Sequence, residues 1–314
     1  MSLPRVSSNP HIRSGATTQL LMFTVILALM PAFGYGIYNF GIRALFVTLV
    51  CVASAVLSEL IFALITKKKI RVSDLSAVVT GLLLALNLPV SIPFWQAALG
   101  SAFAIIVVKE LFGGLGKNFM NPALAGRCFL IISFPVAMTN FVTDTYTGAT
   151  PLALLKSGES VDIRAMVFGN IPGTIGETSM VMILIGACIL LLFGVIDLWI
   201  PGSYILTFVI FLILFGGHGF DPAYISAHLA GGGLMLGAFF MATDYVTRPV
   251  SKKGQVVFGI FLGIMTGIFR IFGPSAEGVS YAIILGNCIV PLIDKFTVPV
   301  PFGLTASEFK KGGR

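Results

Sequence analysis

The sequence predicts an all-α polytopic membrane protein with about ten transmembrane helices, and three observations support that fold class. The 314 residues are 56% hydrophobic and only 11% charged, whereas a soluble domain carries about 25% charged residues. The mean hydropathy is +0.97. The 35 glycines also fit a membrane bundle, because glycine lets membrane helices pack closely. We therefore treat residues 1–314 as a single membrane domain in contact with membrane lipid.

The apolar stretches have the length that a bilayer requires, which is roughly 20 residues per helix with a range of about 17–25. The third and fifth stretches are short and carry proline, which predicts broken or tilted helices. By this measure about ten spans are expected: 19–38, 43–66, 74–91, 94–112, 122–139, 178–198, 201–217, 224–242, 254–272 and 279–296.

The basic residues predict the orientation of this bundle. With ten spans, most of them fall on one side, namely Arg5 and Arg13, the run 67–71, Lys109 with Lys117, the segment 248–253 and the tail 310–314. Lysine and arginine are enriched in cytoplasmic loops. We therefore expect the lead (1–18) and the tail (297–314) in the cytoplasm, residues 140–177 as an extracytoplasmic loop, and the protein in the cell inner (plasma) membrane. The net charge of +7 reflects this topology and does not indicate nucleic-acid binding.

A weak internal repeat relates two parts of the chain. Residues 112–116 (FGGLG), followed by Asn121-Pro122-Ala123, are similar to residues 215–219 (FGGHG), followed by Asp221-Pro222-Ala223. The units are three helices long, so the second copy is inverted, and inverted repeats place a site near a pseudo-two-fold axis. Asn121 and Asp221 are typical N-caps before a proline at the first helical position. The alternative is that glycine pairs and prolines simply end and start membrane helices.

The extracytoplasmic loop contains the pattern D-x-x-T-G-A-T at residues 144–150. Gly148 and Ala149 leave the backbone open to close approach, and Pro151 biases Thr150 toward an extended conformation. This arrangement presents the Thr150 hydroxyl to a modifying enzyme. The alternative is a loop in which these residues merely form a turn.

Two further positions of this motif have expected roles. Asp144 can orient the acceptor hydroxyl, bind the metal of the modifying enzyme or form an Asx turn. Thr147 shapes the loop and is not itself modified. The motif's core recurs at residues 14–17 (SGAT), where His11 stands in place of the aspartate and the segment is cytoplasmic by the charge rule. We therefore expect no modification at Thr17.

Residues 144–152 resemble the flavinylation motif D-x-x-[ST]-G-A-[ST] of the membrane subunits RnfD and NqrB. The similarity covers nearly the whole chain, and the short lead is closer to RnfD. It includes SDLS at 73–76, NPA at 121–123, MATD and TRP within 241–249, residues 277–287, and PLID at 291–294. The resemblance implies that a flavin transferase outside the cytoplasm esterifies the phosphate of FMN to Thr150. It also implies a ten-helix inverted-repeat bundle related to urea transporters.

The same resemblance implies an electron-carrying subunit of the Rnf complex, which couples ferredoxin:NAD⁺ electron transfer to export of Na⁺ or H⁺. The partners would be iron–sulfur and flavin subunits, including a flavin subunit on the outer side, and a non-covalent riboflavin is a further candidate cofactor. The sequence has no dinucleotide fingerprint and no cluster ligands, so the chain is not catalytic alone. Two alternatives stay open: the B subunit of a Na⁺-translocating NADH:quinone reductase, and a urea-transporter-like solute channel without a redox role.

Ionisable residues inside membrane spans cost roughly 2.5–3.5 kcal/mol each on the insertion scale, so each is a candidate functional group. Glu59 is the best candidate for a cation or proton path. Arg270, at the outer end of the ninth span, can donate to the FMN phosphate that the resemblance implies or extend to the membrane interface. Lys109 and Glu110 can pair with each other, and Arg127 can face the bundle or compensate a neighbouring acid.

The remaining aspartates favour structural roles, and the two remaining histidines stay unassigned. Asp197, Asp244 and Asp294 lie near the inner boundaries of spans and are expected to be caps and interface residues. His218 and His228 flank an outer turn without the spacing of metal ligands. The four cysteines lie singly inside apolar runs, so they indicate neither a metal site nor a disulfide.

Overall fold

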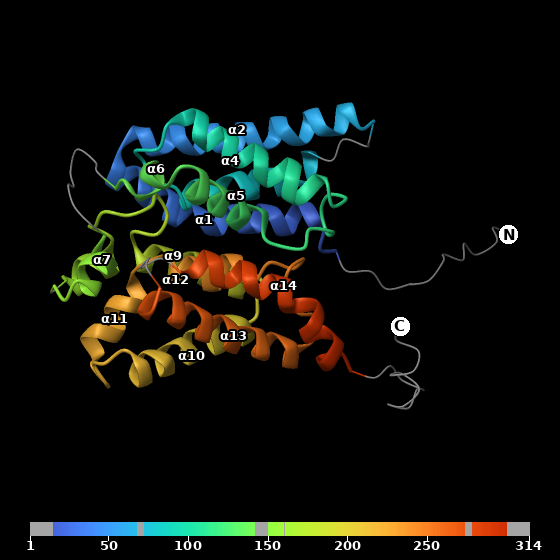
Figure 1. The fold of residues 1–314 in the computed structure, drawn as a ribbon. Helices are drawn as coiled ribbons and strands as arrows, with labels where there is room; N and C mark the ends of the chain where they lie inside the picture. The colour runs from blue at the N-terminus through green and yellow to red at the C-terminus, as the bar shows by residue number, and fades with distance from the viewer. Residues whose placement is uncertain (1–14, 68–71, 142–149, 160, 274–277, 300–314) are drawn as a thin grey trace.

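The computed structural model describes residues 15–67, 72–141, 150–159, 161–273 and 278–299. Within these residues all regular secondary structure is helical, as the predicted fold class requires. The helices of the N-terminal half lie together in the upper part of Figure 1, and most helices of the C-terminal half lie below them.

The helices follow the expected apolar stretches. The first half contains α1 (Thr18–Phe40), α2 (Ile42–Ile65), the 3-10 turn η1 (Val72–Asp74), α3 (Ser76–Leu86), α4 (Phe94–Phe103), the π-helical segment η2 (Ala104–Glu110), α5 (Pro122–Ser133) and α6 (Pro135–Thr139). The second half contains α7 (Pro151–Lys156), α8 (Ile163–Phe168), α9 (Met180–Leu192), α10 (Trp199–Phe215), α11 (Pro222–Ala230), α12 (Leu234–Leu236), the π-helical segment η3 (Gly237–Met241), α13 (Lys252–Ile271) and α14 (Val279–Thr297). Each of the ten stretches therefore contains one helix or a few consecutive helices.

Four helices, α1, α2, α13 and α14, are long and apolar enough to cross a membrane, among the residues that the structure describes. A fifth candidate is the pair α11 and α12–η3, which bends by 63° at its break. The helices α3, α5, α9 and α10 are apolar but shorter. The fifth stretch is broken between α5 and α6, directly before Pro135, because a residue that precedes proline disfavours the helical conformation.

The two predicted N-caps are confirmed. Asn121 Oδ1 accepts a hydrogen bond from the amide of Ala123 at 3.0 Å, at the start of α5. Asp221 Oδ1 accepts one from the amide of Ala223 at 2.9 Å, at the start of α11. In both cases proline occupies the next position, where its missing N–H removes no helical bond.

Close packing of α10 against α13 depends on small residues. A Cβ atom added to Gly263 would lie 2.7 Å from the Cβ of Thr207 and 2.9 Å from the backbone nitrogen of Phe208. Gly259 and Gly267 stand four positions away on either side and therefore share this face of α13. The glycine row lets the two backbones approach as in other small-residue membrane interfaces.

The ends of the helical bundle are well separated. In Figure 1, α1 begins and α14 ends at the right-hand end of the bundle, whereas α7 lies at the left-hand end. The helix α7, which follows the 144–150 motif, therefore lies at the opposite end of the bundle from the start of α1 and the end of α14.

Candidate functional site around Thr150

Thr150 is the N-cap of α7, and Pro151 is the first residue of that helix. Its backbone is extended, with φ −63° and ψ 150°, as the following proline predicts. Within the described part of the chain, its side chain makes no capping hydrogen bond to α7. The matching Thr17 differs, because its hydroxyl oxygen caps α1 by accepting a hydrogen bond from the Leu20 amide at 3.2 Å. Of the two threonines, Thr17 therefore caps its helix with its hydroxyl group and Thr150 does not.

The other motif residues, Asp144, Thr147, Gly148 and Ala149, lie outside the described residues, and their roles stay predictions. Thr150 itself is partly buried and lines a small cavity of about 20 Å³. Such a volume holds about one water molecule. Its other lining residues are Pro151, Leu152, residues 171–174, Glu177, Gly231 and Gly232.

One wall of this cavity is the glycine turn, residues 231–233, which breaks the eighth apolar stretch between α11 and α12. Gly232 and Gly233 have φ angles of 64° and 66°, a region that residues with a side chain rarely adopt. A Cβ at Gly232 would collide with Leu152 of α7, and one at Gly233 would collide with the carboxylate of Glu177. The turn therefore packs against α7 and Glu177 through positions that only glycine fits.

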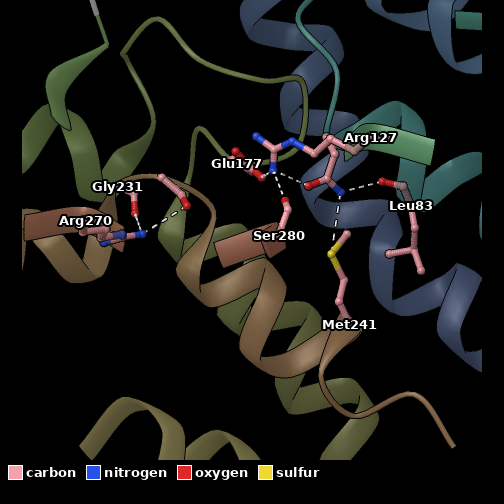
Figure 2. Close-up of polar contacts among 9 residues, drawn as sticks. Leu83, Arg127, Glu177, Gly231, Met241, Arg270 and Ser280 are labelled. Carbon is pink, nitrogen blue, oxygen red and sulfur yellow. Dashed lines mark hydrogen bonds and ion pairs between the residues drawn. The ribbon is translucent and has the colours of Figure 1, made fainter. Parts of the chain in front are cut away.

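Arg270, on α13, holds the glycine turn from its other side (Figure 2). Its Nη2 donates to the carbonyl oxygens of Gly231 at 2.9 Å and Gly232 at 3.1 Å, and its Nη1 donates to the carbonyl oxygen of His228. Only 3% of the residue is exposed, and its guanidinium lies 5.1 Å from the centroid of the Phe208 ring. The interpretation in which Arg270 extends to the membrane interface is wrong, because the charge is held on backbone carbonyls inside the protein. Its contact with a phosphate stays a prediction.

Arg127, on α5, compensates an acid that the sequence analysis did not single out. Its Nη1 lies 3.0 Å from Oε1 of Glu177, and both side chains are 5% exposed. The same nitrogen donates to Oδ1 of Asn87 at 2.9 Å and to Oγ of Ser280 at 3.1 Å (Figure 2). Asn87 follows α3 and Ser280 lies on α14, so this network joins the two halves of the chain.

Glu177 connects the network to the Thr150 cavity, because it pairs with Arg127 and also lines that cavity. Its sequence context, Gly-Glu-Thr-Ser, is typical of a turn and gave no reason to select it. Glu177 could have been predicted from the need to balance the charge of Arg127. A lone arginine inside a span needs a buried acid, and Glu177 directly precedes the sixth span.

Glu59, the candidate for an ion path, is 5% exposed on α2 and lies 3.1 Å from Nζ of Lys109. Lys109 also donates to Oγ of Ser76 at 2.7 Å, and that hydroxyl donates to Oδ1 of Asp74 at 2.6 Å. Lys109 and Ser76 line a further cavity of about 90 Å³. The expected pairing of Lys109 with Glu110 is wrong, because the ammonium group turns toward α2 instead.

Two of the three aspartates near helix ends, Asp244 and Asp294, have structural partners, as expected. Asp244 accepts a hydrogen bond from the Thr247 hydroxyl at 3.3 Å, within one turn of the chain. Asp294 accepts one from the Val250 amide at 3.1 Å and ties α14 to the segment before α13. Asp197 is exposed directly before α10.

His218 and His228 belong to an aromatic row. The rings of His218 and Tyr224 stack with centroids 4.3 Å apart, and Tyr224 meets His228 edge-on at 4.5 Å. Among the residues that the structure describes, no group of three histidine, cysteine or acidic side chains could hold a metal ion.

Comparison with known proteins establishes the family. The sequence model of the NQR2, RnfD, RnfE family matches residues 5–303. The chain belongs to this family. It is 47% identical over 309 residues to the D subunit of the Na(+)-translocating ferredoxin:NAD(+) oxidoreductase complex of Acetobacterium woodii, covering 96% of this chain and 95% of the relative. It is 41% identical over 319 residues to the D subunit of the proton-translocating ferredoxin:NAD(+) oxidoreductase complex of Clostridium ljungdahlii, covering 95% and 96%.

A more distant member is the D subunit of the ion-translocating oxidoreductase complex of Salmonella typhimurium, which is 33% identical over 348 residues and is covered over 98% of its length. The resemblance to RnfD is thus confirmed. In this member of the NQR2, RnfD, RnfE family, the Thr150 cavity is bounded by an acid that Arg127 neutralises and by a turn that Arg270 holds. The surroundings of Thr150 therefore contain the cations Arg127 and Arg270 and the anion Glu177.

Proposed function

We propose that this chain is the D subunit of an ion-translocating ferredoxin:NAD⁺ oxidoreductase complex. The observation that carries this proposal is the 47% identity, over nearly the full length of both chains, to a relative of that name. Complexes named for Na⁺ and for protons both occur among the similar proteins, so the exported ion is Na⁺ or H⁺. Iron–sulfur and flavin subunits would supply the sites for ferredoxin and NAD⁺, and this chain would carry electrons between them.

We further propose that FMN is attached through a phosphoester to Thr150, with the remaining motif residues, Asp144, Thr147, Gly148 and Ala149, shaping the acceptor loop. A flavin supplies one- and two-electron transfer. The observations that support Thr150 are its extended backbone and a hydroxyl that does not cap α7. Esterification leaves a negative charge on the phosphate, and the buried guanidinium of Arg270 behind the glycine turn favours such a charge. A non-covalent riboflavin is a second candidate cofactor of the bundle.

The proposed topology has ten spans in two inverted repeats, in the urea-transporter-like arrangement that the family resemblance implies. Both termini lie in the cytoplasm of a cell with this protein in its inner membrane, and residues 140–177 lie outside, where a flavin transferase reaches Thr150. Support comes from the basic residues and from the position of α7 at the end of the bundle opposite the start of α1. A membrane-impermeant thiol reagent should label a cysteine placed at Asn140 in intact cells, and labelling only after permeabilisation would refute this orientation.

The attachment is tested by co-expressing the chain with a flavin transferase. The denatured wild-type chain should fluoresce in a gel, and its intact mass should exceed that of Thr150→Val by one esterified FMN. The matched control Thr17→Val should keep the fluorescence, and Thr150→Ser should restore it, because serine offers the same hydroxyl. A dark wild-type chain, or fluorescence that persists in Thr150→Val, refutes the attachment.

We also propose that Glu59 belongs to the ion path. Its support is a carboxylate that is buried among helices and paired with Lys109 beside the cavity of about 90 Å³. In the assembled complex, Glu59→Gln should keep the covalent flavin content and lower ion transport driven by ferredoxin oxidation. Unchanged transport would remove Glu59 from the path.

A further inference from the structure

We propose that a cavity beside α7 receives the isoalloxazine ring of a flavin carried on Thr150. The inference rests on the proposed attachment and identifies the part of the fold that would hold the free end of the cofactor. The cavity has a volume of about 260 Å³. Its lining residues include Leu152, Lys156, His218, Tyr224, His228 and Arg270.

Size separates this cavity from the one at Thr150. The cavity at Thr150, of about 20 Å³, admits about one water molecule and no ring. The cavity beside α7, of about 260 Å³, exceeds the roughly 150 Å³ cavity that binds a benzene molecule. Of the two spaces next to α7, only the second can hold a fused aromatic ring.

The position of the cavity suits a tether at Thr150. Leu152 lines both cavities, so the two spaces border the same residue. A helix advances about 1.5 Å per residue, so Leu152 and Lys156 lie roughly 3 Å and 9 Å along α7 from Thr150. A ribityl chain that starts at the Thr150 phosphate and follows α7 would therefore bring the ring to this opening.

The walls offer both a stacking surface and a polar contact. Tyr224 is the centre of the aromatic row, between His218 and His228, and an aromatic ring system stacks favourably on such a surface. His228 is only 7% exposed, and its Nδ1 has no hydrogen-bond partner within the described residues. A buried polar atom without a partner is unfavourable, and a neutral imidazole nitrogen can donate to a carbonyl or accept from an N–H. The pyrimidine edge of isoalloxazine offers both groups.

The charges around the cavity favour an electron-rich ligand. Arg270 and Lys156 both line it, and no acid occurs among its described lining residues. Two cations next to a ring that becomes negative on reduction stabilise the reduced form. The cavity would thus hold the ring and also raise its tendency to accept electrons.

The test uses the full-length chain loaded with covalent flavin and purified in detergent, with iodide as a collisional quencher of flavin fluorescence. In the native wild-type protein, the iodide quenching constant should be several-fold lower than in the denatured chain. Tyr224→Leu should raise the native constant roughly two- to tenfold, which is the range expected from losing one aromatic stacking contact. Tyr224→Phe keeps the ring and should stay close to the wild type.

The matched control is Tyr38→Leu, because Tyr38 is 84% exposed on α1 and does not line the cavity; it should leave quenching unchanged. The wild-type comparison can overturn the ring site even if Tyr224→Leu does not fold. Equal quenching in native and denatured wild-type protein overturns the ring site while the covalent flavin stands. Equal effects of Tyr224→Leu and Tyr38→Leu overturn it as well. A wild-type chain without covalent flavin refutes the attachment to Thr150 instead, and with it the tether on which the ring site depends.

Discussion

The strongest test of the architecture is the buried pair of Arg127 and Glu177, which joins α5 to the segment before α9. The perturbation is Glu177→Gln, which removes the acid's charge and preserves its shape. The two charged groups are 3.0 Å apart and each side chain is 5% exposed, so the remaining guanidinium would stay buried without its counter-charge. Removing one partner of such a pair costs about 3–5 kcal/mol. Because glutamine still offers a carbonyl oxygen, we expect a loss of about 3 kcal/mol in the free energy of unfolding.

The partner substitution should cost more. Arg127→Met leaves the carboxylate of Glu177 buried without its counter-charge. It also removes the group that donates hydrogen bonds to Oδ1 of Asn87 and Oγ of Ser280. Each buried acceptor that loses its hydrogen bond adds about 1–3 kcal/mol. Replacing both charges, in Arg127→Met with Glu177→Met, should recover much of the loss, because a buried ion pair exchanged for apolar side chains is often neutral.

The assay is unfolding in detergent, followed by circular dichroism, as a double-mutant cycle. Arg127→Met, Glu177→Met and their combination give the coupling energy between the two positions, which should reach about 3 kcal/mol, the upper end for residues in contact. Glu159→Gln is the matched control, since Glu159 is exposed and its charge should contribute nothing measurable. The buried ion pair is refuted if Glu177→Gln behaves like Glu159→Gln, or if the effects of Arg127→Met and Glu177→Met simply add.

Three further predictions use the same unfolding assay. Thr17→Val removes the cap of α1 and should cost about 1 kcal/mol; no loss would mean that the hydroxyl does not cap. Lys109→Met leaves the carboxylate of Glu59 buried without its counter-charge and should lower the free energy of unfolding by about 3–5 kcal/mol. This loss should exceed that of Glu59→Gln, and a larger loss in Glu59→Gln would contradict the pairing of Lys109 with Glu59. Gly263→Leu forces α13 away from α10 and should cost at least about 1–3 kcal/mol, whereas Gly202→Leu, whose Cβ would meet nothing within 4 Å, should cost less.

Local signals in the sequence predicted the helices and their starts. Apolar length placed a helix in every expected stretch, because a bilayer demands that length wherever the helix packs. The caps at Asn121 and Asp221 were predictable for a similar reason, since an N-cap bonds only to amides two or three residues ahead. The extended backbone of Thr150 followed from Pro151 alone.

The partners of the buried charges could not be predicted in this way. Glu59 and Lys109 lie on α2 and η2, and the pairing depends on which helices become neighbours. The sequence suggested Glu110 as the partner of Lys109 because it is adjacent, but adjacent residues on a helix do not face each other. The break at residues 231–233 was also missed, because Gly-Gly-Gly within an apolar run can be a packing surface as well as a break.

Arg270, which donates hydrogen bonds to the glycine turn, makes this break unsuitable for binding a cation. In many transporters a broken helix offers free backbone carbonyls, and these carbonyls bind Na⁺ or other cations. Here a guanidinium already occupies three such oxygens, from His228, Gly231 and Gly232. A sodium ion that approached this break would meet a fixed positive charge. The break between α11 and α12 is therefore an unfavourable position for a bound cation.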